Sequence, residues 1–167
     1  MEARAARPWS IPMPRLPASV SEFLAGKRFA VAGVSRQPQQ PANAIYRKLR
    51  GIGLDVVPIN PKAAEVEGVH CYPDLASIPG YVDRVVIVTP PDAALNLVRQ
   101  CGYKGVGQVW SHRSFGSGSV SPEAVKDCKA RGIGCIVGGC PMMYCEPVDV
   151  GHRCIRRWLR LFGRVPG

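Results

Sequence analysis

Short apolar segments alternate with helix-forming segments along most of this 167-residue chain. The apolar segments are brief and rich in β-branched residues, which is typical of buried strands rather than helices. They span residues 28–33, 54–60, 82–89, 107–110 and 133–137. Strands that alternate with helices build parallel sheets, because each crossover returns the chain to the same sheet edge. The pattern therefore predicts an α/β fold of three layers, with a five-stranded, mostly parallel sheet.

Helix signals fill the intervals between these strands. Proline in the first turn and glycine after the last turn mark most of them. The expected helices cover residues 21–25, 41–51, 91–101, 122–131 and 151–162, and a short extended piece is expected at 69–71. In the last helix, Ile155, Leu159 and Phe162 are expected to face inward and the arginines outward. This order of elements predicts a Rossmann-like domain over residues 20–167 with helices on both faces of the sheet.

The first 19 residues are expected to form a flexible tail. Four prolines interrupt this segment, where a secretory signal would need an apolar run. They are Pro8, Pro12, Pro14 and Pro17. Seven cysteines, an odd number, do not suggest a disulfide framework, so we expect reduced thiols and a cytoplasmic location. The sequence does not decide whether translation begins at Met1 or at Met13.

The formal net charge is +10, and arginines near the two ends of the chain supply much of it. A basic chain attracts anionic partners. The sequence lacks an aromatic RNA-binding motif, a zinc finger and a basic recognition helix, so we expect no nucleic-acid partner. The longest apolar run, at 85–88, is far below the ~20 residues of a membrane span, so no membrane partner is expected either.

A Gly-Val-Ser turn, Gly33 to Ser35, follows the first strand and precedes a helix. Loop amides and helix starts at this place bind phosphate groups, and Gly33 permits close approach of a backbone or a ligand. Val34 lies within the turn, Ser35 offers a hydroxyl group and Arg36 adds a positive charge. The G-x-G-x-x-G pattern of NAD-binding domains is missing. A tight strand-to-helix connection without a ligand is also compatible with this turn.

Asn60-Pro61-Lys62 follows the second strand, where NAD-binding domains carry an acid for the ribose 2′-hydroxyl. Lysine is a compact positive charge that suits phosphate. The presence of Lys62 in place of the acid disfavours NAD and favours a ligand with an additional phosphate on or near its ribose. Coenzyme A (CoA) and NADP both meet this requirement. A solvent-exposed loop lysine without a ligand is the alternative.

Thr89, Pro90 and Pro91 follow the third strand. Two successive prolines form a stiff wall without amide donors, which can line the flat face of an adenine. A proline in the first turn of a helix is the alternative explanation. Because the carboxyl ends of parallel strands meet at one sheet edge, all three loops are expected to face one ligand crevice.

The order of four segments resembles the stand-alone CoA-binding domain family. The segments are G-V-S-R, V-P-I-N-P-K, G-V-H-C-Y-P-D-L-A-S-I-P and V-I-V-T-P-P-D, within residues 20–162. This family is similar to the N-terminal domain of the succinyl-CoA synthetase alpha subunit. The resemblance implies that the Gly-Val-Ser turn faces the pyrophosphate of CoA, that Lys62 meets a phosphate and that the Thr-Pro-Pro segment flanks the adenine. The expected cofactor-binding residues are Gly33, Val34, Ser35, Arg36, Asn60, Lys62, Thr89, Pro90 and Pro91.

Other candidate side chains lie towards the C-terminus. Trp110 is expected in the core, whereas His112 and Arg113 are candidates for contact with a phosphate or a pantetheine carbonyl. A cluster of cysteines and one histidine is a loose match to zinc spacings, and no metal is expected there. Its members are Cys135, Cys140, Cys145, His152 and Cys154. The Cys140-Pro141-Met142-Met143 pattern occurs in some members of the resembled family, without a role that its residues reveal.

The three histidines show no catalytic spacing, and the chain has no room for the phosphohistidine domain of the synthetase relative. We therefore expect a non-catalytic module that binds CoA or a short acyl-CoA, in a regulatory or carrier role. It would act alone, as a homodimer or beside a partner enzyme subunit. One alternative is an NADP-dependent oxidoreductase or an accessory subunit of a CoA ligase. A second alternative is a thiol redox sensor that uses Cys140 or Cys145.

Overall fold

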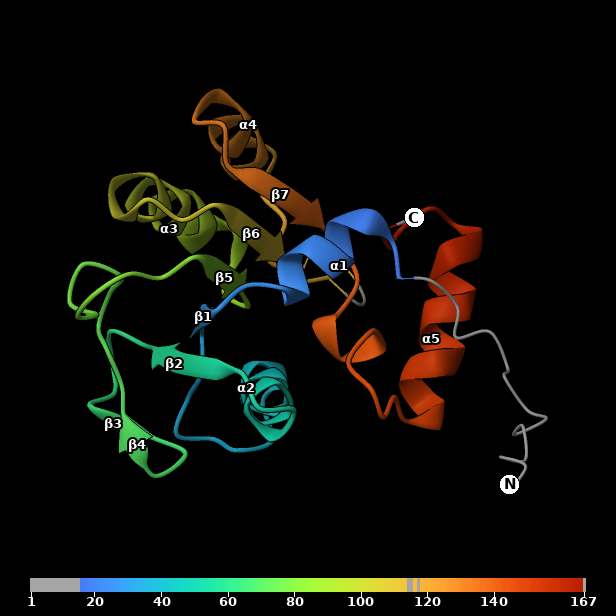
Figure 1. Cartoon of the computed structure of the whole chain (residues 1–167), viewed down its shortest axis with the longest axis horizontal. Coiled ribbons are helices and arrows are strands. Elements are labelled where there is room, and N and C mark those ends of the chain that lie inside the picture. The colour runs from blue at the N-terminus through green and yellow to red at the C-terminus, as the bar shows by residue number, and fades with distance from the viewer. Residues whose placement is uncertain (1–15, 114–115, 117, 167) are drawn as a thin grey trace, which may run out of the picture.

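A five-stranded parallel sheet forms the centre of the molecule in the computed structural model, which describes residues 16–113, 116 and 118–166 (Figure 1). The strand order is β2-β1-β5-β6-β7. The strands are Arg28–Ala32 (β1), Asp55–Ile59 (β2), Arg84–Ile87 (β5), Gln108–Ser111 (β6) and Gly134–Val137 (β7). The predicted class, number of strands and parallel direction are confirmed. A small antiparallel hairpin, Glu65–Val66 (β3) with Val69–His70 (β4), contains two of the three residues of the extended piece predicted at 69–71.

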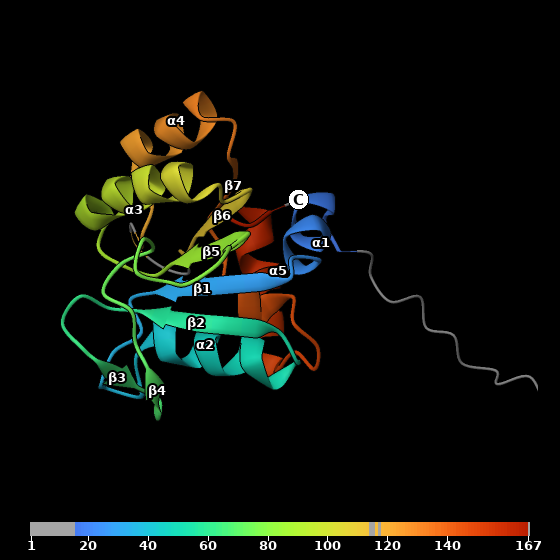
Figure 2. The same ribbon diagram turned by 60° about the vertical axis from the view of Figure 1, so that its left-hand side comes forward.

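Helices cover both faces of this sheet (Figure 2). One face carries Ala18–Leu24 (α1), Pro41–Gly51 (α2) and Val150–Leu161 (α5), and the other carries Pro91–Lys104 (α3) and Pro122–Ala130 (α4). A short 3₁₀ helix, Pro141–Met143 (η1), precedes α5. The three predicted layers are therefore present. None of the helices in the described ranges has the length and apolar character to cross a bilayer.

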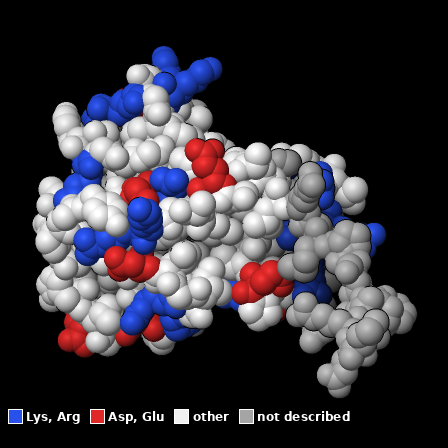
Figure 3. Space-filling model, in the orientation of Figure 1, with Lys and Arg blue, Asp and Glu red and all other residues white. Residues whose placement is uncertain are grey.

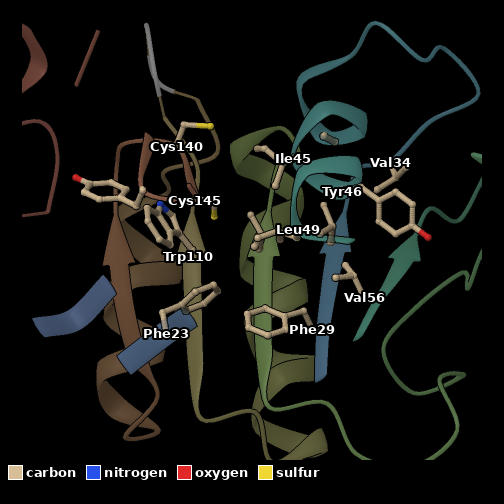
Figure 4. Close-up of a cluster of buried hydrophobic side chains, with 14 of the residues drawn as sticks. Phe23, Phe29, Val34, Ile45, Tyr46, Leu49, Val56, Trp110, Cys140 and Cys145 are labelled. Atoms are coloured by element: carbon tan, nitrogen blue, oxygen red, sulfur yellow. The ribbon is translucent and has the colours of Figure 1, made fainter. Parts of the chain in front are cut away.

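The alternation of side chains along β1 explains how one short strand joins two cores. Phe29 and Val31 pack against α1 and α2, whereas Ala30 and Ala32 pack against α3. Successive strand residues point to opposite faces, and a central strand covered on both sides must be apolar throughout. Figure 4 shows Phe29 in the first of these clusters, near Leu49 of α2.

Six helix ends differ from their predicted positions by one to three residues, and three of these differences have a clear structural cause. α1 begins at Ala18, inside the predicted tail, because Val20 is already fully buried; residues 1–15 of that tail lie outside the described residues. α3 continues past Gly102 to Gly105, whose φ of 76° ends it. The expected inward position of Phe162 is wrong. α5 ends at Leu161, the chain turns there, and Phe162 is 60% exposed.

The sheet has a switch point between β1 and β5. The chain moves from β1 outward to β2, and then crosses back to β5 and continues outward to β6 and β7. The helices after β1 and β5 therefore leave on opposite faces, which opens a crevice at the carboxyl ends of these strands. The Gly-Val-Ser turn and the Thr-Pro-Pro segment follow β1 and β5 at this position.

Candidate functional site

A pocket of about 640 Å³ lies at the switch point, between the ends of β1, β2 and β5 and the first turns of α3. Five of the nine predicted residues line it: Gly33, Asn60, Lys62, Thr89 and Pro90. The other four, Val34, Ser35, Arg36 and Pro91, are outside its lining, although each adjoins the lining segments in the chain. Three loops that are far apart in sequence thus meet at one pocket.

Gly33 is required by the packing of the sheet. Its φ is +103°, and a Cβ atom there would lie 2.2 Å from the carbonyl oxygen of Val88. Its N–H group donates to the carbonyl oxygen of Ile59 at 3.0 Å. The close approach predicted at Gly33 is therefore made by the backbone that leaves β5, and this approach sets the width of the pocket at that point.

Asn43, on the buried face of α2, holds the turn after β1. Its side-chain oxygen accepts from the N–H of Ser35 at 3.0 Å, and its amide nitrogen donates to the carbonyl oxygen of Ser35 at 2.7 Å. The same nitrogen donates to Glu67 at 2.7 Å. Only 1% of Asn43 is exposed. The sequence interpretation missed this residue, because no local pattern indicates that its amide bonds to the turn and to Glu67.

Asn60 connects the loops that follow β1 and β2. Its amide nitrogen donates to the carbonyl oxygen of Val34 at 2.8 Å, and its side-chain oxygen accepts from the N–H of Lys62 at 2.8 Å. The side chain of Val34 is fully buried in the core, so this residue can meet a ligand only through its backbone. The hydroxyl of Ser35 accepts from the N–H of Gln37 at 3.1 Å. These bonds give both loops a fixed shape.

Thr89 presents a polar group that the protein leaves unpaired. Its hydroxyl oxygen is buried and has no hydrogen-bond partner among the described residues. A buried hydroxyl without a partner is costly, and a polar ligand group can remove that cost. Pro90 lines the pocket beside it, whereas Pro91 is the first residue of α3, so the helix-start explanation holds for Pro91. Because this oxygen is buried, a ligand in the pocket would reach it only if the Thr89 side chain rotated.

The pocket is lined by charged residues of both signs. Lys62 is at one side, and Asp74 and Asp92 also line the pocket. The hydroxyl and N–H of Ser77 both donate to Asp74 at 2.8 Å, which lowers the pKa of that carboxyl group below its ordinary value. Phosphate groups are repelled by ionised carboxylates. The Lys62 side therefore suits phosphate, and the carboxylate positions suit hydroxyl or amino groups of a ligand.

The remaining candidates lie outside this pocket. The backbone N–H of His112 donates to Ile87, and Arg113 pairs with Gly139 beyond β7. Burial, aided by the nearby His152, lowers the pKa of His112 to about 4, so its imidazole is neutral near pH 7. Neither residue belongs to the pocket lining.

The predicted cysteine cluster is dispersed. Cys140 and Cys145 are buried in the core beside α2, Cys135 lies on β7 and Cys154 is exposed on α5. Within the described ranges, no group of three or more His, Cys, Asp or Glu side chains is arranged to hold a metal ion. Burial raises the pKa of Cys140 to about 12 and that of Cys145 to about 11. Both thiols are therefore protonated near neutral pH, which makes them poor nucleophiles.

Known proteins share this sequence pattern. A family model described as "CoA binding domain" matches residues 27–146. The ADP-forming acetate–CoA ligase I of Archaeoglobus fulgidus is 39% identical over 80 residues, which are 48% of this chain but only 12% of the ligase. The uncharacterized protein YneT of Bacillus subtilis is 25% identical over 124 residues, which are 74% of this chain and 89% of YneT.

Solved structures show the same relationship. A hypothetical protein from Pyrococcus horikoshii OT3 has a TM-score of 0.72 and 29% identity, over 81% of this chain and 98% of that protein. The dinucleotide-forming acetyl-coenzyme A synthetase 1 of Ca. Korarchaeum cryptofilum has a TM-score of 0.59 and 31% identity, over 67% of this chain and 25% of the synthetase. Because the family model matches most of the chain and includes all three pocket loops, this protein belongs to the CoA-binding domain family.

Proposed function

We propose that this protein binds CoA, or a short acyl-CoA, in the pocket at the switch point. The observation that carries the proposal is that three separate loops of the family region line one pocket, and that Lys62 and Thr89 are among its lining residues. Its relatives include ligases named for acetate and CoA, which supports the same ligand class. A ligand with several phosphates also suits a chain of net charge +10.

Each part of the pocket suits a different part of CoA. Lys62 would meet a phosphate, and the backbone of the Gly-Val-Ser turn, with Arg36 beside it, would face the pyrophosphate. Pro90 offers an apolar surface for the adenine. The hydroxyl of Thr89 would hydrogen-bond to a polar group of the ligand. Asn60 would act by positioning both loops, because both ends of its side-chain amide are bonded to backbone.

The role that we propose is binding without catalysis, in a regulatory or carrier capacity. Among the described residues that line the pocket there is no histidine or cysteine, and Asp74 and Asp92 are its only carboxylates. An accessory role beside a CoA ligase subunit is a second candidate, since the ligases that match contain this region as a small part of their length. The raised pKa values of Cys140 and Cys145 oppose the redox-sensor alternative. A cytoplasmic location with reduced thiols is part of the same proposal.

A panel of ligands tests the proposal by thermal unfolding. We expect CoA to raise the melting temperature, and the shift should grow with the logarithm of the CoA concentration above Kd, by mass action on the folded state. NADP and NAD are expected to give much smaller shifts at equal concentration. A clear shift with NADP and none with CoA would reject CoA as the ligand and favour the NADP alternative. Acetyl-CoA, run in parallel, reports whether a short acyl group is accepted.

Replacement of Lys62 by alanine is expected to weaken CoA binding roughly tenfold, the loss of a charge-assisted contact at an exposed position. If Lys62 meets the 3′-phosphate, dephospho-CoA should lose much less affinity than CoA in a titration of the same variant. The control is Lys126→Ala, which removes an exposed lysine of α4. Equal losses for both ligands would move Lys62 to the pyrophosphate, and unchanged affinity for both would remove it from the site.

A further inference from the structure

α5 carries two apolar stripes on different sides. The inner stripe contains Ile155 and the fully buried Leu159, which pack against the core. The outer stripe follows at spacings of four, four and three residues, which place its members along one helix face. It consists of Val150, Cys154, Trp158 and Leu161. A surface helix needs only one apolar stripe to bind to its own fold, so the outer stripe requires a separate explanation.

The outer stripe is open to solvent. Val150 is 74% exposed, Trp158 48% and Leu161 80%. Phe162, which follows the helix, is 60% exposed, and its ring centroid lies 4.8 Å from that of Trp158. Single exposed apolar residues are ordinary, but contiguous exposed apolar patches mark interaction surfaces. Trp158, Leu161 and Phe162 gather at the C-terminal end of α5, which lies at one end of the molecule in Figure 1, and Val150 lies at the other end of the same stripe.

The helix is held firmly to the fold, so the patch is preformed. Asp149 caps its N-terminus and accepts from the N–H of His152 at 2.9 Å. The guanidinium group of Arg156 donates to the carbonyl oxygen of Met143 at 2.7 Å and lies over the ring of Tyr144. After the helix, the hydroxyl of Tyr144 donates to the carbonyl oxygen of Pro166. Arg156 and Leu159 therefore attach the inner side of α5 to the fold, while the outer side stays exposed.

A row of positive charge borders the outer stripe. Helical spacing places the exposed side chains of Arg153, Arg157 and Arg160 together along one edge of it, which we call the arginine edge. Residues 150–164 contain no aspartate or glutamate, and Asp149 is bound to the His152 ring. Figure 3 shows blue side chains at the right-hand side, where α5 lies. The surface thus combines aromatic and aliphatic groups with a helix that carries positive charge and no acidic residue of its own.

We propose that α5 binds an anionic lipid surface, with Trp158, Leu161 and Phe162 at the boundary between headgroups and acyl chains and the arginine edge against the headgroups. Arginines beside a stripe of Trp, Phe and Leu are the composition of helices that lie in a membrane interface. Because the arginine edge is positively charged, it favours an anionic lipid surface over a neutral one. The prediction of no membrane partner rested on the lack of a spanning segment, which an interfacial helix does not need, and this proposal revises it.

A second copy of this chain is a poorer occupant. Two α5 helices packed through their outer stripes would bring their arginine edges close together without acids on either helix to pair with them. The proposal is also independent of CoA, because α5 contributes no residue to the pocket lining. Failure of either proposal would therefore leave the other standing.

Co-sedimentation with lipid vesicles tests the proposal. The full chain is expected to bind vesicles of phosphatidylglycerol mixed with phosphatidylcholine, and to bind phosphatidylcholine alone much more weakly. Each arginine near an anionic surface contributes about a fivefold gain in partitioning, so replacing Arg153, Arg157 and Arg160 together by glutamine should reduce binding about a hundredfold. Tryptophan emission should shift to shorter wavelength on binding, and the Trp158→Phe variant should lose that shift.

A matched variant controls for net charge. Replacing Arg99, Lys126 and Lys129 by glutamine removes the same charge from exposed positions on α3 and α4, on the other face of the sheet, and should leave vesicle binding near that of the unmodified chain. Leu161→Ser with Phe162→Ser tests the apolar component and should weaken binding at least tenfold. Equal losses in the two triple variants, or equal binding to both vesicle types, would overturn the proposal. So would a dimer in sedimentation that the two serine substitutions abolish.

Discussion

Replacement of Gly33 by alanine is expected to lower the free energy of unfolding by about 3–5 kcal/mol. Two costs add at this position. The first is the φ of +103°, which alanine rarely adopts, and the second is the 2.2 Å approach of the new Cβ to the carbonyl oxygen of Val88. The obstacle is backbone, so it cannot rotate away. The strand ends must separate, and the pocket lies between them. We therefore expect CoA binding to be lost as well.

Gly53→Ala is the matched control. Gly53 has a similar φ of +89°, but nothing lies within 4 Å of its added Cβ atom. Its substitution should therefore cost only the backbone strain, about 1–2 kcal/mol, and leave CoA affinity unchanged. Urea denaturation of both variants measures the difference. If the two substitutions cost the same, the contact between β1 and β5 would be looser than the structure indicates.

The motif at Gly33 predicted one property of the turn and left another open. A glycine after a buried strand indicates a close approach, but not whether a ligand or a backbone makes it. The strands themselves were predictable because parallel central strands contain continuous apolar runs, such as residues 85–88, that are short and rich in β-branched residues. The convergence of three loops followed from that topology alone, since parallel strands bring their carboxyl ends to one edge.

Features that depend on distant contacts were not predictable. Asn43 holds the first turn partly through Glu67, 24 residues away, and no local pattern indicates that pairing. Asp74 reaches the pocket because the segment after β4 passes beside α3. At the end of α5, periodicity placed Phe162 inward, but periodicity holds only while the helix continues. The chain leaves the helix after Leu161, and the side chain becomes part of the exposed patch.

Trp110 is the second position where a large effect is expected. Its side chain is fully buried, and its indole N–H donates to the carbonyl oxygen of Gly138 at 2.9 Å. The ring packs edge-on against Phe23 at 5.3 Å and lies 5.8 Å from Tyr144. Trp110 thus connects β6 to α1 and to the segment that supports α5. The prediction that it belongs to the core is confirmed.

Trp110→Ala is expected to lower the free energy of unfolding by about 4–5 kcal/mol, since it creates a cavity and leaves the Gly138 carbonyl without its donor. Trp110→Phe keeps much of the volume and should cost about 1–2 kcal/mol, mainly the lost hydrogen bond. Trp158→Ala, at a half-exposed tryptophan, should cost less than about 1 kcal/mol. Denaturant titration followed by circular dichroism compares all three.

The same variants separate stability from binding. Trp110 packs on the α1 and α2 face of the sheet, whereas the pocket opens between the strand ends and α3. Folded Trp110→Phe protein should therefore bind CoA with the affinity of the unmodified chain, in contrast to Gly33→Ala. Because Trp110 supports the segment beneath α5, a loss of vesicle binding in Trp110→Ala would come from loosening of that support. A loss of CoA affinity in Trp110→Phe would mean that the two faces of the sheet are coupled more strongly than their separate cores indicate.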